Sequence, residues 1–265
     1  MLVITKISTQ KNNSDRFNLY VNEKFTCGVD ADVLVKFNLQ KGKEISKLEL
    51  SEIMYADECQ KAFNQAIVYL SYRMRAESEI RTYLKQKDVG QAVIDEVVHR
   101  LHRQKYLDDQ EFANAYVRTQ VNGGKKGPNV IKQELKQKKI NDQYIDEALT
   151  FYPESKQIEH AIHLGEKLVK QQKKLSEKIL KQKMEQTLMI KGFPFSIISI
   201  VMEEIEYERD GDEEWDALVI QFEKADRKFR SLQGYEYKMK VKNFLYRKGF
   251  PLELIDQLLA EKEEA

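Results

Sequence analysis

The sequence predicts a mainly α-helical protein, an elongated and curved array of three-helix repeats behind a small N-terminal segment that contains a β-hairpin. Three observations predict this fold class. The 265 residues include only 11 Gly and 4 Pro, so long stretches can run as helix without a breaker. From about Leu48 onward the apolar residues follow helical spacing, and one motif recurs four times. Residues before about position 45 show strand-like alternation instead.

The head is expected to span residues 1–47 and to hold two or three antiparallel strands. Residues 2–8 are rich in β-branched side chains, and apolar and polar residues alternate over 17–21. A turn after position 21 would lead into a third strand at 25–29. Asp30 is expected to cap a short helix over 31–37, because its carboxylate can accept hydrogen bonds from the first-turn amides.

The repeat motif is a Leu, a Lys three residues later and an apolar residue two positions after that Lys. The four leucines are separated by 51, 53 and 57 residues, at Leu84, Leu135, Leu188 and Leu245. The leucine is expected in the core, and the Lys suits the negative end of a helix. Gly192 and Gly249 stand where a left-handed residue is wanted, and Asp88 and Lys139 replace them at a small cost.

Each copy needs a preceding helix, and these are expected over 62–72, 108–119, 158–171 and 214–229. Asp108 and Glu111 form a capping box at the second of them. The predicted repeats therefore span 48–107, 108–153, 154–209 and 210–265. Short helices bury their apolar faces poorly alone, so stacking of neighbouring units is expected.

Composition excludes several classes of protein. The 44 Lys+Arg and 43 Asp+Glu give a net charge of +1, which neither favours nor excludes nucleic acid. Cys27 and Cys59 are far apart, so neither a disulfide scaffold nor a zinc ribbon is expected. No apolar run reaches the length of a membrane span, and no signal peptide is recognised. These features favour a cytoplasmic protein, and we expect it to be a monomer.

No chemical site is predicted. The basic loop 123–127 lacks the spacing of a phosphate-binding P-loop. The pairs His99/His102 and His160/His163 have helical spacing, but no further ligand completes either as a zinc site. Adjacent carboxylates such as Asp108/Asp109 point apart on a helix. The sequence therefore predicts neither an enzyme nor a bound metal or cofactor.

Charge is concentrated in blocks, with net +6 over 167–191, −8 over 200–216 and +7 over 224–248. One interpretation is a solvated surface on which neighbouring units attract one another. The other is a basic rim that contacts DNA phosphates or an acidic surface of a partner. The candidate contact residues are Arg73, Arg75, Arg81, Lys125, Lys126, Lys132, Lys136 and Lys138. As a hypothesis, the groups Arg73/Arg75 and Lys125/Lys126 make the contact with the partner.

The segments 70–80 and 106–113, followed by Gly127-Pro128, resemble the first and second repeats of the RecX family. The resemblance covers about residues 62–260, and the head and fourth repeat are similar to the longer members from low-GC Gram-positive bacteria. Ala76 departs from the family pattern where a Ser cap is frequent, and Lys139 departs where Gly is common.

This resemblance implies a regulator of RecA in DNA repair, the SOS response and homologous recombination. Such proteins bind RecA–single-stranded DNA filaments, lodge along the filament groove and mostly inhibit ATPase activity and strand exchange. The alternative is a single-stranded DNA-binding protein that competes with RecA for DNA.

Overall fold

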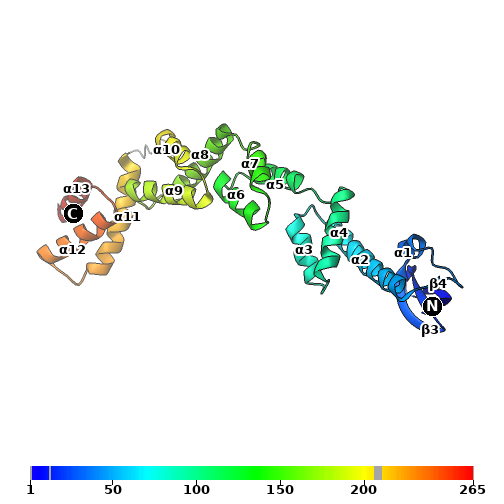
Figure 1. The fold of residues 1–265 in the computed structure, drawn as a ribbon. Helices are drawn as coiled ribbons and strands as arrows, with labels where there is room; N and C mark the ends of the chain where they lie inside the picture. Colours follow the sequence, from blue (N-terminus) through cyan, green and yellow to red (C-terminus); the bar gives the residue numbers. More distant parts are fainter. Residues whose placement is uncertain (1, 12, 206–210, 265) are drawn as a thin grey trace. The chain divides into compact units, whose positions relative to one another are not determined.

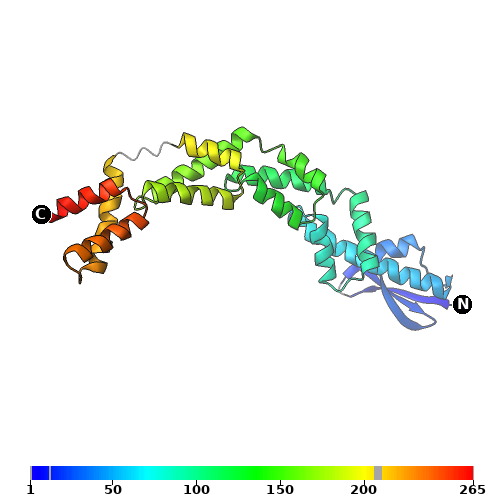
Figure 2. The same cartoon turned by 60° about the vertical axis from the view of Figure 1, so that its left-hand side comes forward.

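The computed structural model describes residues 2–11, 13–205 and 211–264. These form two compact units, Met1–Ala113 with Gln137–Tyr144, and Asn114–Lys136 with Ile145–Ala265. Helices dominate both units, and the strands lie in the first (Figures 1 and 2). The mainly α fold with a small N-terminal sheet is therefore confirmed. Part of the acidic block over 200–216 lies outside the described residues, since 206–210 are not among them.

The head is a four-stranded antiparallel sheet with one short helix. Its elements are β1 (Leu2–Gln10), β2 (Asn13–Val21), β3 (Lys24–Asp30), α1 (Ala31–Lys36) and β4 (Glu44–Ile45), with strand order β3-β2-β1-β4. Asn22 and Glu23 both have positive φ, as the tight turn between β2 and β3 requires. The predicted cap is confirmed, because Asp30 accepts a hydrogen bond from the amide of Asp32 at 3.0 Å.

The helix α2 (Lys47–Ser71) joins the head to the first repeat. It begins at Lys47, close to the onset of helical periodicity expected at about Leu48, and continues without a break through the helix expected over 62–72. Ser46 and Glu49 form a capping box at its start. Ile53 is buried in the head core, and Phe63 is buried in the core of the first repeat. The two cores thus share one continuous helix.

The remaining helices occur in groups of three. The first repeat adds α3 (Glu77–Lys85) and α4 (Gln91–Arg103) to α2. Next come α5 (Asp109–Gly123), α6 (Pro128–Gln137) and α7 (Asp142–Leu149). The later groups are α8 (Glu154–Gln171), α9 (Glu177–Lys191) and α10 (Phe195–Glu204), then α11 (Gly211–Phe229), α12 (Gly234–Arg247) and α13 (Leu252–Glu264). The middle helices α3, α6, α9 and α12 carry the motif leucines.

The local predictions for the motif are confirmed. All four motif leucines are at most 1% exposed. Gly192 and Gly249 both have φ of 87°, and Asp88 and Lys139 take left-handed φ values of 59° and 60°. The amide of Glu111 donates to the Asp108 carboxylate at 2.9 Å, so the predicted cap of α5 is also present. The recurring break after each middle helix is therefore encoded by its sequence.

Candidate interaction surface

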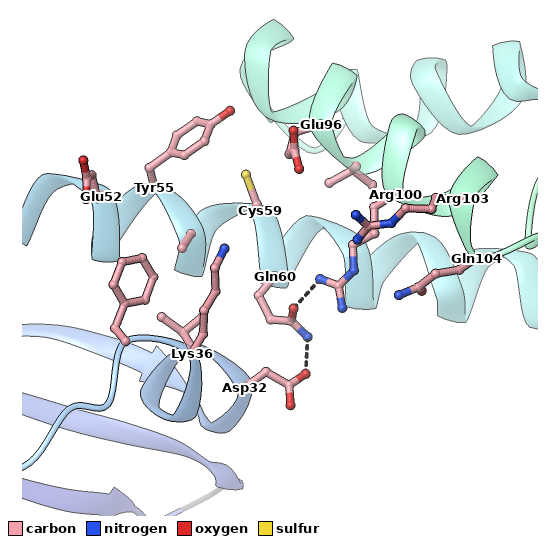
Figure 3. A pocket seen from close by; sticks show the side chains of 14 residues that line it. Asp32, Lys36, Glu52, Tyr55, Cys59, Gln60, Glu96, Arg100, Arg103 and Gln104 are labelled. Atoms are coloured by element: carbon pink, nitrogen blue, oxygen red, sulfur yellow. Dashed lines mark hydrogen bonds between the residues drawn. The ribbon is translucent and has the colours of Figure 1, made fainter. Parts of the chain in front are cut away.

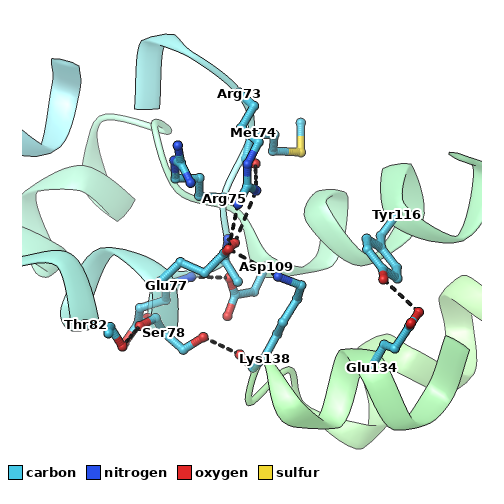
Figure 4. A network of polar contacts seen from close by, with 12 residues as sticks. Arg73, Met74, Arg75, Glu77, Ser78, Thr82, Asp109, Tyr116, Glu134 and Lys138 are labelled. Atoms are coloured by element: carbon cyan, nitrogen blue, oxygen red, sulfur yellow. Dashed lines mark hydrogen bonds and ion pairs between the residues drawn. The ribbon is translucent and has the colours of Figure 1, made fainter. Parts of the chain in front are cut away.

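The predicted contact residues of the first repeat contact neighbours within the fold. Figure 4 shows how Arg73 and Arg75 lie. Arg73 forms an ion pair with Glu79 at 2.8 Å and donates to the carbonyl of Met74. The guanidinium of Arg75 lies 3.5 Å from the ring centroid of Tyr69 and donates to the Tyr69 carbonyl at 2.9 Å. Both side chains therefore help to fix the backbone conformation of the segment between α2 and α3.

Glu79 brings together two predicted contact residues that are far apart in the sequence. Lys138, beyond the end of α6, lies 3.2 Å from the carboxylate that Arg73 binds. Burial raises the pKa of Glu79, but hydrogen bonds from Arg73, the amide of Ala76 and Lys138 outweigh it and lower that pKa to about 2. Glu79 therefore stays ionised near neutral pH, and its negative charge is shared by Arg73 and Lys138.

Arg81 is compensated by carboxylates from two helices. Its guanidinium contacts Glu77 at 2.6 Å, one helical turn earlier, and Asp95 of α4 at 2.5 Å. The Nε2 atom of His102 lies 2.6 Å from the second oxygen of Glu77. Burial raises the pKa of Glu77, but hydrogen bonds from Arg81 and His102 outweigh it and leave the pKa below its ordinary value. Arg81 is thus part of a packed polar cluster.

The lysines of the second repeat differ from one another. Lys126 pairs with Glu134 at 2.5 Å, and Lys132 pairs with Asp146 at 2.6 Å. Glu134 also accepts a hydrogen bond from Tyr116 at 2.8 Å. Lys136 and Lys125 are exposed. Lys125 forms no ion pair within the part of the chain that the structure describes.

Three joints between successive middle helices were not predicted from the sequence. Each joins the carbonyl of the motif Lys, at the C-terminal end of one middle helix, to the N-terminal end of the preceding middle helix. The donors and acceptors are Ser78 Oγ to Lys138 O at 2.5 Å, Gly127 N to Lys191 O at 2.7 Å, and Ser176 Oγ to Lys248 O at 2.6 Å. Carbonyls that have no partner within their own helix are thereby satisfied.

Glycine permits the close approach at two of these joints. A Cβ added at Gly192 would lie 2.5 Å from the backbone nitrogen of Val130, and one at Gly127 would lie 2.4 Å from the carbonyl carbon of Gly192. A Cβ at Gly249 would lie 2.5 Å from the hydroxyl of Ser176. Gly192 and Gly249 therefore serve both the left-handed turn and the contact between repeats.

Carboxylates from the next repeat complete two joints. Asp109 accepts a hydrogen bond from the amide of Glu77 at 2.8 Å. Glu214 accepts from the amide of Glu177, with its two oxygens at 3.1 and 3.2 Å. A negative charge at a helix N-terminus is favourable, so each contact stabilises the middle helix of the preceding repeat.

A cavity of about 730 Å³ lies beside α1, α2 and α4 in the first unit (Figure 3). Its wall carries Gln60, which donates to Asp32 at 3.0 Å and accepts from Arg100 at 2.6 Å. The Arg100 guanidinium also lies 3.8 Å from the ring centroid of Phe63. These contacts tie the head to α4, so the polar wall of the cavity contributes to the fold.

One histidine of each pair contacts another side chain of the protein. His102 contacts Glu77, and His160 contacts the hydroxyl of Tyr152 at 3.0 Å. Among the described residues no group of three or more His, Cys, Asp or Glu side chains is placed to hold a metal ion. The described helices also include none that is both long and apolar enough to span a membrane.

Family models match five segments of the chain. Residues 2–46 match the regulatory protein RecX N-terminal domain, and residues 62–101 and 108–149 match the first and second RecX three-helix domains. The third RecX three-helix domain matches twice, over 155–202 and 212–259. The fourth repeat is therefore similar to the third.

Relatives and solved structures agree with these matches. Regulatory protein RecX of Bacillus subtilis (strain 168) is 52% identical over 263 residues, covering 99% of this chain and 100% of the relative. The Bacillus velezensis protein of the same name is 49% identical over 264 residues, covering 99% and 100%.

A crystal structure of regulatory protein RecX matches with a TM-score of 0.69 and 36% identity, covering 77% of this chain and 100% of the other. The crystal structure of RecX from Lactobacillus salivarius matches with a TM-score of 0.53 and 35% identity, covering 56% and 97%. Taken with the head and the repeated three-helix units, these similarities show that the chain belongs to the RecX family.

Proposed function

We propose that this protein regulates RecA by binding RecA filaments on single-stranded DNA and mostly inhibiting their ATPase and strand-exchange activities. The observation that carries the proposal is the match along 99% of the chain to relatives named regulatory protein RecX. The protein acts as a monomeric binding protein of the cytoplasm, with no enzymatic activity of its own.

The pairing of its cations favours a protein partner over simple competition for DNA. Binding to phosphates is driven by release of counterions, and it needs cations that are available to replace them. Most of the candidate residues instead contact a carboxylate or an aromatic ring of this chain. Within the described part of the chain these include Arg73, Arg75, Arg81, Lys126, Lys132 and Lys138.

The candidate residues stay proposed contacts, with different tests for different positions. Arg73 remains half exposed and lies between the exposed side chains of Tyr72 and Met74, which is a composition typical of protein interfaces. Charge reversal at Arg73 would also break its pair with Glu79. Lys125→Glu is the cleaner variant, because it removes no ion pair among the described residues.

The second candidate function, competition for single-stranded DNA, is favoured by α12. Tyr235 and Tyr246 are exposed on this helix, as are Lys240 and Arg247. Aromatic rings that stack bases, interspersed with cations, are typical of single-stranded DNA binding.

Titration against RecA tests the proposal and separates the two functions. DNA-dependent ATP hydrolysis is measured on preformed filaments while this protein is added far below the RecA concentration. Regulation of the filament predicts inhibition in that range. Competition for DNA predicts inhibition only near saturation of the DNA, with steep weakening by salt. An unchanged rate at every ratio would contradict both functions.

A further inference from the structure

Three large apolar side chains are exposed around the turn between α9 and α10. Met189 and Ile190 near the end of α9 are 58% and 77% exposed, and Phe195 at the start of α10 is 70% exposed. The adjacent Leu188 and Phe193 are buried in the core of the third repeat. The turn is thus anchored by other residues, and the three exposed side chains are not needed to hold it.

The same positions are polar in the first two repeats. Aligned on the motif leucines, Met189, Ile190 and Phe195 correspond to Lys85, Gln86 and Gln91 of the first repeat and to Lys136, Gln137 and Asp142 of the second. A three-helix unit of this family therefore forms with polar residues at these positions. The exposed apolar residues of the third repeat call for an explanation other than folding.

Two lysines belong to the same region of the second unit. The amides of Gly127 and Asn129 donate to the carbonyls of Lys191 and Gly192 at 2.7 and 3.0 Å, so the loop before α6 is fixed against the end of α9. That loop carries Lys125. Lys125 and Lys191 are both exposed, and neither side chain forms an ion pair within the described ranges.

We propose that Met189, Ile190 and Phe195, flanked by Lys125 and Lys191, form a docking surface for an acidic, apolar surface of the protein component of the filament. This α9–α10 surface rests on the proposed function and assigns part of its partner contact. Exposed Met and Phe are enriched at protein interfaces, and the two lysines supply complementary charge for acidic residues at its rim.

Two other occupants fit this composition less well. Single-stranded nucleic acid binds by stacking its bases on flat rings, and only Phe195 of the three apolar residues is aromatic. A second copy docked through the same surface would bring Lys125 and Lys191 of both copies together, and like charges at an interface oppose association.

The test measures binding to preformed RecA filaments immobilised through their single-stranded DNA. The first variant carries Met189→Gln, Ile190→Gln and Phe195→Gln. At positions 190 and 195 it has glutamine, as the first repeat has at the corresponding Gln86 and Gln91. The control Val35→Gln, Leu48→Gln, Val68→Gln replaces three aliphatic side chains of the first unit that are 75%, 70% and 56% exposed. Affinity of the first variant should fall about tenfold or more, because a few apolar anchors dominate most interfaces. The control should bind like the wild type.

Two further variants sharpen the test. Ile190→Gln alone removes the most exposed apolar side chain of the surface. This single variant replaces the triple variant if the latter proves unstable, and it should weaken binding. Lys125→Glu with Lys191→Glu should mainly slow association and reduce its dependence on salt.

The possible outcomes separate this inference from the proposed function. A wild-type protein that does not bind filaments contradicts the proposed function itself. If the wild type binds and the folded α9–α10 variants bind equally well, the docking surface is wrong while the function stands. Parallel loss of affinity for free single-stranded DNA would assign the surface to nucleic acid and overturn the inference.

Discussion

Gly192→Ala should separate the second and third repeats at their joint. Gly192 has φ of 87°, where an L side chain is strained, and its added Cβ would lie 2.5 Å from the Val130 nitrogen and 2.6 Å from Cγ2 of the same residue. Since backbone atoms cannot move aside cheaply, α6 must shift away from the end of α9. The hydrogen bonds from Gly127 and Asn129 would then be lost or lengthened.

The expected cost combines strain and lost hydrogen bonds. A left-handed φ costs an alanine about 1–2 kcal/mol. Two backbone hydrogen bonds contribute about 0.5–1.5 kcal/mol each. The free energy of unfolding of the second unit should therefore fall by about 2–5 kcal/mol. Gly234→Ala is the matched control in the same unit, because Gly234 also has positive φ but its added Cβ would meet nothing within 4 Å. Its cost should be limited to about 1–2 kcal/mol of strain.

Urea unfolding followed by tryptophan fluorescence measures this difference. Trp215 is the one tryptophan of the sequence, and it packs against the core of the fourth repeat within the second unit. Hydrogen exchange at Gly127 and Asn129 reports the joint itself, and both amides should exchange faster in Gly192→Ala. Equal destabilisation by the two glycine variants, with unchanged exchange at these amides, would refute the close joint.

Four further predictions follow from the fold. Leu135→Ala should lower the free energy of unfolding by about 2–5 kcal/mol, because Leu135 is fully buried, and calorimetry measures the loss. Asp57→Ala should cost about 3–5 kcal/mol in the same assay, because it leaves the largely buried Arg16 without its partner at 2.8 Å. Glu79 has a pKa of about 2 against an ordinary 4.5, so its stabilisation is present above pH 4.5 and is lost as the pH falls toward 2. Between those pH values the wild type should lose stability more steeply than Glu79→Gln. The elongated, curved shape of the array stays a prediction, and a small-angle scattering profile typical of a compact sphere would contradict it.

The repeat and its core were predictable because they depend on local periodicity. The motif leucines, the left-handed residues after them and the cap at Asp108 each follow from side-chain type at fixed spacing, and all are present. The continuity of α2 from Lys47 to Ser71 and the strand β4 were not predicted. The strand Glu44–Ile45 has only two residues, too few for a period, and it forms by pairing with Leu2 and Val3.

The charged surface was less predictable, because pairing depends on packing between distant segments. The sequence identified Arg73 and Lys138 as cations but not that they meet at Glu79. The pair Glu77/Arg81 was detectable, since its residues are four apart on a helix. The joints link residues 60 and 72 positions apart, as in Ser78 to Lys138 and Ser176 to Lys248, and no local pattern encodes them.

Direct action on the RecA filament is tested most simply by comparing two binding partners at two salt concentrations. Equilibrium binding of the labelled protein is measured on preformed RecA–single-stranded DNA filaments and on the same DNA without RecA, at about 50 and about 200 mM salt. The account predicts tighter binding to the filament at both concentrations, with a shallower dependence on salt than for DNA alone. Equal affinity for filament and bare DNA, falling by the same factor with salt, would contradict it.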